Sequence, residues 1–304
     1  MKTVFMGTPA FAATCLQALL ETGNEVVGVY TKVDTPKNRG MKLIPSEVKV
    51  LAQANNLPVY QPKTFRDDEV YEELKTLAPD LIVVVAYGKI LPQRVLDIPP
   101  LGCVNIHGSI LPSLRGAAPV QWAVLKDLPE TGVTAMYMNA GMDEGDIIDV
   151  RTTDIGPNET AGELMDRLAV LGAELLKDTV RAISEGTACR RAQDPTLATY
   201  APMLSRELSP IHWENPAKQI LAQIRGLNPW PVASAELAGT AFKIHEARMW
   251  PEPVEAEPGT PTALNKKGLV VACGDGAILI TKLQAQGGKV LNAPDYFRGH
   301  PIQL

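Results

Sequence analysis

Short apolar strands alternate with helical patterns through the first half of this 304-residue sequence. The strand-like runs cover residues 3–6, 25–30, 81–86 and 103–106, and helical patterns cover 10–21, 46–54 and 67–77. Two more strands are predicted at 133–138 and 147–153, followed by a long helix that ends near residue 185. Strands that are joined through helices pair in parallel, so we predict an α/β domain with a mostly parallel sheet covered on both faces.

The pattern changes after residue 186. A polar stretch that contains Arg190, Arg191 and Pro195 interrupts the helical periodicity and is typical of a linker. Strand-like runs bounded by Gly and Pro follow at 232–237, 241–249, 268–272 and 277–283, with one helical pattern at 216–224. We therefore predict a first domain over residues 1–188, a linker over 189–208 and a smaller, mostly antiparallel β-barrel domain over 209–304.

The composition is that of an ordinary globular protein, with 45% hydrophobic and 21% charged residues. The longest apolar runs, such as residues 81–86, are too short to cross a bilayer. Residues 1–6 lead into Gly7 and Pro9 without the apolar core of a signal peptide. We expect a protein that works in the cytoplasm, without a membrane partner and as a monomer.

Cysteine and histidine spacing argues against disulfides and against a metal site. Successive cysteines lie more than 80 positions apart, at residues 15, 103, 189 and 273, so they are expected to be reduced core thiols. The four histidines, at residues 107, 212, 245 and 300, have no spacing typical of metal ligands. We expect no metal.

Charge points to one segment as a contact for a polyanion. The net charge is −5, from 29 basic and 34 acidic residues, so no uniform basic field surrounds the protein. Between Lys32 and Lys49, however, five basic residues stand against two acidic ones, which gives a local balance of +3. If the protein binds nucleic acid, we expect this segment, with Lys37, Arg39 and Lys42, to contact it.

The residues with the clearest chemical potential follow the predicted strand 103–106. Asn105 and His107 are two positions apart at its carboxyl end, so their side chains point to the same face. Open α/β sheets bind ligands at this edge. An amide N–H can stabilise an oxyanion, and an imidazole can carry a proton near neutral pH. The pair therefore favours acyl transfer.

A nearby carboxylate and the lack of a nucleophile motif refine the acyl-transfer hypothesis. The glycine-bracketed loop 140–146, after the predicted strand 133–138, contains Asp143, Glu144 and Asp146, and a carboxylate there could orient His107. No Gly-x-Ser-x-Gly elbow and no cysteine flanks His107, and Ser109 is the only nearby hydroxyl. We therefore expect an incoming amine to attack a bound acyl donor directly, without a covalent enzyme intermediate.

These motifs resemble the folate-dependent formyltransferase family. The resemblance rests on Asn-x-His-x-Ser-x-Leu-Pro at 105–112, Arg-Gly at 115–116 and Met-Asp-x-Gly at 142–145. It extends over nearly the full length, from Gly7-Thr8-Pro9 through the basic segment to Arg298-Gly299. These further blocks are similar to the two-domain members that act on charged initiator tRNA, rather than to the one-domain members that act on glycinamide ribonucleotide.

The resemblance implies a fold and a reaction. It implies a Rossmann-like catalytic domain followed by a C-terminal domain of OB-fold type that binds tRNA. It also implies transfer of a formyl group from 10-formyltetrahydrofolate to the α-amino group of methionine on initiator methionyl-tRNA. Because a free α-amino group has a pKa near 8, the acceptor must lose a proton before it attacks.

The resemblance also assigns roles to residues. It implies a catalytic set of Asn105, His107 and Asp143, and it puts Arg39 on the loop that contacts the tRNA acceptor end. The folate-binding residues that it implies are a loop and a wall of the pterin pocket: Ser109, Ile110, Leu111, Pro112, Tyr87, Gly88, Ile90 and Leu91.

Three other functions compete with this interpretation. A formyltransferase acting on a sugar or nucleotide amine could use the same residues, although such an acceptor needs neither the basic segment nor the second domain. An NAD-linked oxidoreductase is disfavoured because Gly7-Thr8-Pro9 lacks the Gly-x-Gly-x-x-Gly phosphate cradle. A noncatalytic RNA-binding module would leave Asn105 and His107 incidental.

Overall fold

The computed structural model describes residues 1–37, 42–302 and 304. Two compact units are present, and each consists of separate stretches of chain. The first unit contains Met1–Pro119, Thr131–Thr153 and Met165–Ala201. The second unit contains Val120–Glu130, Asp154–Leu164 and Pro202–Leu304.

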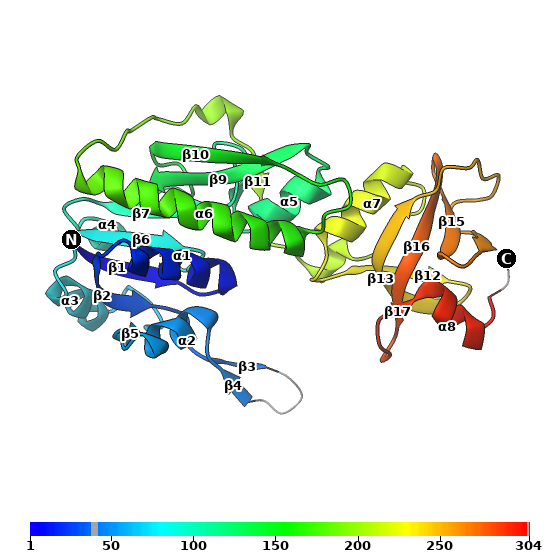
Figure 1. Ribbon diagram of the computed structural model, residues 1–304, viewed down its shortest axis with the longest axis horizontal. Coiled ribbons are helices and arrows are strands. Elements are labelled where there is room, and N and C mark those ends of the chain that lie inside the picture. Colours follow the sequence, from blue (N-terminus) through cyan, green and yellow to red (C-terminus); the bar gives the residue numbers. More distant parts are fainter. Residues whose placement is uncertain (38–41, 303) are drawn as a thin grey trace. The chain divides into compact units, whose positions relative to one another are not determined.

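A seven-stranded sheet forms the centre of the first unit (Figure 1). The strand order is β10-β9-β7-β6-β1-β2-β5. The neighbours from β5 to β7 pair in parallel, and β9 pairs with β7 in the antiparallel direction. The strand bounds are Lys2–Gly7 for β1, Glu25–Tyr30 for β2, Val59–Tyr60 for β5, Leu81–Val85 for β6, Cys103–His107 for β7, Glu130–Tyr137 for β9 and Ile147–Asp154 for β10. The predicted mostly parallel sheet is confirmed.

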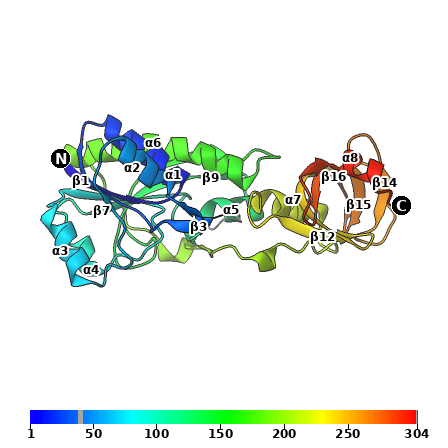
Figure 2. The same ribbon diagram turned by 90° about the horizontal axis from the view of Figure 1, so that it is seen from below.

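Helices cover both faces of this sheet (Figure 2). On one side lie α1 (Ala10–Glu21), α2 (Glu47–Ala54) and α6 (Ala161–Ser184), and on the other lie α3 (Asp68–Thr76) and α4 (Gln93–Leu96). Alternate strand residues such as Val4 and Met6 pack in one buried cluster with Leu74 of α3. On the opposite face, α6 approaches closely, since a Cβ added at Gly172 would lie 3.1 Å from Ile106. The strand period of two therefore supplies both layers of core.

Short elements complete the first unit, and the sequence patterns did not predict them. β3 (Thr35–Lys37) and β4 (Lys42–Ile44) pair as an antiparallel hairpin within the basic segment. β8 (Arg115–Gly116) pairs in parallel with β11 (Tyr200–Ala201), which belongs to the predicted linker. Strands of two or three residues are too short to show a hydrophobic period.

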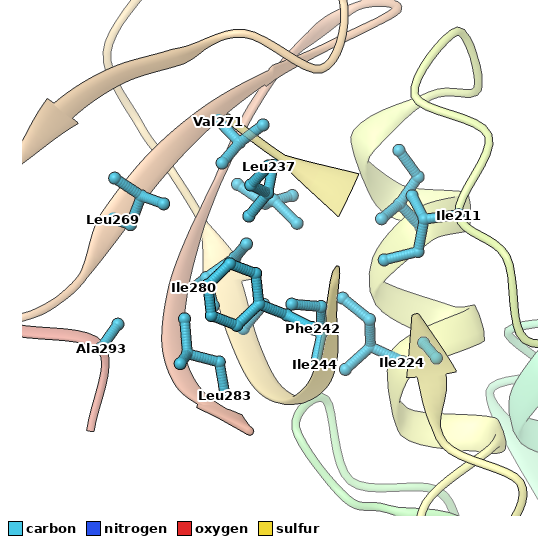
Figure 3. Close-up of a cluster of buried hydrophobic side chains, with 14 of the residues drawn as sticks. Ile211, Ile224, Leu237, Phe242, Ile244, Leu269, Val271, Ile280, Leu283 and Ala293 are labelled. Carbon is cyan, nitrogen blue, oxygen red and sulfur yellow. The ribbon is translucent and has the colours of Figure 1, made fainter. Parts of the chain in front are cut away.

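An antiparallel sheet forms the second unit, with the order β12-β13-β16-β15-β14 and with β17 beside β16. Its pairs are antiparallel, which confirms the predicted strand arrangement. The strand bounds are Ala233–Leu237 for β12, Thr240–Met249 for β13, Pro261–Leu264 for β14, Leu269–Cys273 for β15, Gly276–Ala285 for β16 and Leu291–Asn292 for β17. Inward residues such as Phe242, Ile244 and Ile280 meet in one buried cluster with Ile224 of α7 (Ala217–Gly226) and Phe297 of α8 (Ala293–Gly299) (Figure 3).

The stretch Val120–Glu130, from the first half of the sequence, also packs within the second unit. Most of α5 (Pro119–Leu125) belongs to it, and a Cβ added at Gly226 of α7 would lie 2.6 Å from the Cγ atom of Leu125. Arg225 of α7 donates a hydrogen bond of 2.7 Å to Asp127, and Lys218 lies 2.9 Å from the same carboxylate. The second unit therefore depends on side chains that stand about 100 positions earlier in the chain.

Candidate active site

The carboxyl end of β7 carries Asn105 and His107, as the strand period requires. Asn105 lies opposite Met136 of β9, and His107 lies opposite Thr134. His107 is buried, with 6% of its surface exposed, whereas Asn105 is partly exposed. Among the residues that the structure describes, no hydrogen bond engages the Asn105 carboxamide. This amide is therefore available to a ligand.

His107 has an acceptor beside each ring nitrogen. Its Nε2 lies 3.0 Å from the carbonyl oxygen of Leu114, and its Nδ1 lies 3.7 Å from Oδ2 of Asp143. The first distance is a hydrogen bond, and the second is longer than one. Because Nε2 already has a hydrogen-bond partner and Nδ1 lies too far from Asp143 for a hydrogen bond, Nδ1 is the ring nitrogen that can still bind a further partner.

The Asp143 carboxylate is held in place by its own neighbours. The backbone N–H of Gly116 donates a hydrogen bond of 2.8 Å to Oδ2 of Asp143, the oxygen nearest to His107. Asp143 has a φ of 54°, in the left-handed region that few residues other than glycine adopt. Such a backbone persists where surrounding contacts hold it, and this often occurs at functional sites. The structure thus brings the three predicted catalytic residues to one edge of the sheet.

The segment from Ser109 to Pro112 follows β7 and is fastened to β9. Thr134 donates to the Ser109 carbonyl oxygen at 2.6 Å and accepts from the Leu111 N–H at 3.1 Å. The Ser109 hydroxyl is fully buried and donates to the Ser113 carbonyl at 2.6 Å. Leu111 is buried as well, whereas Ile110 and Pro112 are partly exposed. Of the four residues, Ile110 and Pro112 can reach a ligand directly.

The residues predicted to form a wall of the pterin pocket follow β6, and they too include both buried and exposed members. Tyr87 packs in the core, where its ring lies 6.1 Å from Phe65, and burial raises the pKa of its hydroxyl. Leu91 is also buried, whereas Gly88 is exposed and Ile90 is 89% exposed. The structure therefore leaves Gly88 and Ile90 accessible and encloses the other two.

The basic segment is only partly described. Lys37 and Lys42 pair with each other in the β3-β4 hairpin, at the register position that borders residues 38–41. Arg39 lies outside the described residues. The hairpin backbone thus puts two of the three predicted tRNA contacts side by side.

No metal cluster and no membrane span is found in the described part of the chain. Groups of three or more His, Cys, Asp or Glu side chains that could hold an ion are absent from it. None of its helices combines the length and the apolar character needed to cross a bilayer.

Sequence reasoning missed two residues that hold this site together. Thr134 fastens the segment after β7, as described above, and Gln193 of the predicted linker contacts both Arg115 and the loop around Asp143. Their partners lie between 23 and 78 positions away in the sequence. No local pattern marks such residues, so only the folded chain reveals them.

Family models match both parts of the sequence. The model of the formyl transferase family matches residues 1–180, and the model of the formyl transferase C-terminal domain matches residues 203–301. The chain belongs to the formyl transferase family. This membership fits a site where an amide and an imidazole on β7 lie near the Asp143 carboxylate and where the Ser109 hydroxyl is buried and bonded to Ser113.

Relatives of the chain within the formyl transferase family are similar over its whole length. The methionyl-tRNA formyltransferase of Trichlorobacter lovleyi is 45% identical over 303 residues, which cover 100% of this chain and 95% of that protein. The methionyl-tRNA formyltransferase of Pseudomonas entomophila is 48% identical over 297 residues, which cover 98% of this chain and 95% of that protein.

Solved structures of other proteins share the fold. HypX from Aquifex aeolicus, crystallised with tetrahydrofolic acid, aligns with a TM-score of 0.66 at 19% identity and covers 98% of this chain and 47% of its own. An N-formyltransferase from Helicobacter canadensis, in complex with folinic acid and dTDP-3-aminofucose, aligns with a TM-score of 0.70 at 19% identity. That alignment covers 92% of this chain and 98% of the Helicobacter chain.

Proposed function

We propose that this protein transfers a formyl group from 10-formyltetrahydrofolate to the α-amino group of methionine on charged initiator tRNA. The observation that carries the chemistry is the juxtaposition of His107 and Asp143, 3.7 Å apart, with the unengaged Asn105 amide on the same face. The acceptor is proposed because full-length relatives at 45–48% identity are named methionyl-tRNA formyltransferases.

Asn105 and His107 would stabilise the oxyanion that forms when the amine adds to the formyl carbon. The Asn105 amide donates one hydrogen bond, and the His107 Nδ1–H donates a second from the edge beside Asp143. The Asp143 carboxylate stabilises the positive charge of the ring and helps to take up the proton that the amine loses. The tetrahedral intermediate would then collapse: the bond between the formyl carbon and N10 of the folate breaks, N10 takes up a proton, and tetrahydrofolate leaves. The Leu114 carbonyl fixes the ring through Nε2, so that Nδ1 stays directed to the reacting atoms.

Direct attack by the amine agrees with the lack of a suitable nucleophile near β7 in the described chain. The Ser109 hydroxyl is fully buried and donates to Ser113, so it cannot reach a donor without breaking that bond. Cys103 lies two residues before Asn105 on β7, but burial, followed by the nearby charge of Asp97, raises the pKa of its thiol to about 12. A thiol with such a pKa supplies almost no thiolate at neutral pH.

Folate binding is proposed for the segments that flank this edge of the sheet. Ile110 and Pro112 after β7, and Gly88 and Ile90 after β6, are accessible and would contact the donor. Ser109, Leu111, Tyr87 and Leu91 are buried, so they would support these contacts from behind. The proposal assigns no role to a metal ion.

Contact with tRNA is proposed for Lys37, Arg39 and Lys42 of the basic segment. Lys37 and Lys42 occupy paired backbone positions of β3 and β4, and contacts between basic residues and phosphate weaken steeply as salt rises. Because the proposed acceptor is a charged initiator tRNA, we propose that the reaction takes place in the cytoplasm. We propose that the chain acts as a monomer.

The test is formylation of methionyl initiator tRNA by the purified protein, with and without 10-formyltetrahydrofolate. Product is measured as formylmethionine after release from the tRNA. Asn105→Ala and His107→Ala should each lower turnover by about two to four orders of magnitude, because each removes a donor to the oxyanion. His212→Ala, at an exposed histidine, is the matched control and should keep wild-type turnover.

Two outcomes would overturn the proposal. Near-normal turnover in the Asn105 or His107 variant would remove that residue from the mechanism. Formylation of a sugar nucleotide amine or a glycinamide ribonucleotide, without formylation of the charged tRNA, would show that the acceptor is a small molecule.

A further inference from the structure

The Gln193 side chain bridges two segments of the site described above. Its amide nitrogen donates to the carbonyl oxygens of Asp143 and Gly145, at 2.8 Å each. Its amide oxygen accepts from Arg115, at 3.1 Å from Nε and 2.8 Å from Nη2. One carboxamide therefore joins the carboxylate loop to the segment that follows β7.

Both segments joined by Gln193 set the environment of His107. Leu114, immediately before Arg115, supplies the carbonyl that accepts from His107 Nε2. Gly116, immediately after it, supplies the N–H that donates to the Asp143 carboxylate. A shift of Arg115 against the Asp143 loop would therefore change both distances at the His107 ring.

The Arg115 guanidinium makes this bridge sensitive to change. Arg115 is only 4% exposed, and its Nη1 atom also lies 3.5 Å from Oε1 of the Glu144 carboxylate. A buried guanidinium that loses a hydrogen-bond partner is costly, because water does not replace that partner. The Gln193 oxygen satisfies two of its N–H groups at once.

Gln193 itself stands on a fixed backbone. Two residues before it, Arg191 exchanges backbone hydrogen bonds of 2.8 and 3.0 Å with Ile147 at the start of β10. One residue after it, the Asp194 carboxylate accepts from the N–H of Thr196 at 2.9 Å. The amide thus meets the Asp143 loop from a segment already tied to the edge of the sheet, which limits how far that loop can move.

We propose that Gln193 is a positioning residue that sets the place of the Asp143 carboxylate relative to His107. This inference rests on the proposed formyl transfer for its kinetic consequence, but the geometric claim does not depend on the identity of the acceptor. Gln193 acts through the backbone of the Asp143 loop and through Arg115, and it needs no contact with either substrate.

Two variants distinguish the acceptor contact of Gln193 with Arg115 from its donor contacts with the Asp143 loop. Gln193→Met keeps the length of the side chain and removes both kinds of contact. Gln193→Glu keeps an acceptor for Arg115 but replaces the donor by a carboxylate that faces two carbonyl oxygens. Both variants should lower kcat by about 10- to 100-fold, because small misplacement of a reacting group costs this much. KM for tRNA and for the folate donor should stay within about threefold.

Controls separate positioning from general damage. Gln53→Met at an exposed position of α2 is the matched substitution and should leave kcat and KM unchanged. In an Asp143→Asn background, Gln193→Met should cost less than about threefold, because the carboxylate that Gln193 positions is no longer there. An equal loss in both backgrounds would overturn the inference.

A measurement without substrate completes the test. The chain has four histidines, so the His107 ring signal in a proton–carbon NMR spectrum can be assigned with His107→Gln. Gln193→Met and Gln193→Glu should move this signal, and Gln53→Met should not. An unmoved His107 signal in both Gln193 variants would overturn the inference.

The design also separates this inference from the proposed function. If the wild-type protein does not formylate charged tRNA and the His107 signal still moves, the function fails and the positioning stands. If Gln193→Met does not fold, Gln193→Glu carries the test alone, because Arg115 keeps its partner.

Discussion

The strongest test of the site is Asp143→Asn, because this change removes one charge and little else. Asparagine has the shape of aspartate, and its side-chain oxygen can still accept from the Gly116 N–H, which now donates to Asp143 at 2.8 Å. The negative charge 3.7 Å from His107 Nδ1 disappears. The variant therefore isolates the electrostatic part of the His107–Asp143 interaction.

The size of the effect follows from this distance. Two unit charges 3.7 Å apart interact by about 4 kcal/mol at an effective dielectric constant of about 20. Each factor of ten in rate corresponds to about 1.4 kcal/mol, so complete loss would lower turnover by about three orders of magnitude. The Asp143 side chain is 16% exposed, and solvent weakens the interaction, so we expect a loss of about 100- to 1,000-fold.

The assay is turnover at saturating concentrations of tRNA and folate donor, with Asp146→Asn as the matched control. Asp146 lies on the same loop, and its recorded charged partner, Arg190, is 3.8 Å away. Asp146→Asn should change turnover by less than about threefold, since an exposed ion pair contributes little. Turnover of Asp143→Asn within about tenfold of wild type would refute the electrostatic reasoning.

Three further predictions concern stability and reactivity. Ile280 is fully buried in the core of the second unit, so Ile280→Ala should lower the free energy of unfolding, measured with denaturant, by about 2–5 kcal/mol; a loss below about 1 kcal/mol would contradict that packing. Hydrogen bonds from Lys49, and then from Gln61, hold the pKa of Asp34 below its ordinary value, so Asp34 should stabilise the fold above the pKa of the unfolded chain. The stability difference between wild type and Asp34→Asn should therefore shrink as pH falls from about 4 through the lowered pKa, and a constant difference in denaturation curves would contradict this. The expectation of four core thiols is wrong for Cys189, which is exposed, and right for Cys15, Cys103 and Cys273, which are buried. A thiol reagent at pH 8 should therefore modify about one thiol per chain, and Cys189→Ser should abolish this reaction, because burial raises the pKa of the other three thiols, to about 12 for Cys15 and Cys103 and about 11 for Cys273. Rapid reaction in the Cys189→Ser variant would be the contrary result.

The sequence was most informative where a periodic pattern ran for several turns or a whole strand. Helix α1 spans Ala10–Glu21, and strand β2 spans Glu25–Tyr30, as the patterns predicted. The shared face of Asn105 and His107 follows from the strand period alone. In buried strands and amphipathic helices, burial determines the order of apolar and polar residues along the chain, which is why these elements can be predicted.

Contacts between distant short segments could not be predicted in this way. The pairing of Tyr200 with Arg115 in β11 and β8 joins strands of two residues, and such strands carry no period. Gln193 stands in a polar stretch that is typical of a linker, and its structural role depends on its hydrogen bonds to the loop around Asp143, 50 positions away. The left-handed backbone of Asp143 is likewise set by its partners and not by its neighbours in the sequence.

The second unit includes Val120–Glu130 as well as the C-terminal residues, and this limits where the chain can be truncated. A fragment ending at residue 188 would retain Asp127 but lose Arg225 and Lys218, the two cations beside its carboxylate. It would also uncover Leu125, which packs against Gly226. Such a fragment would present apolar side chains and an unpaired acid to water, and we expect it to aggregate unless α5 is redesigned with polar residues.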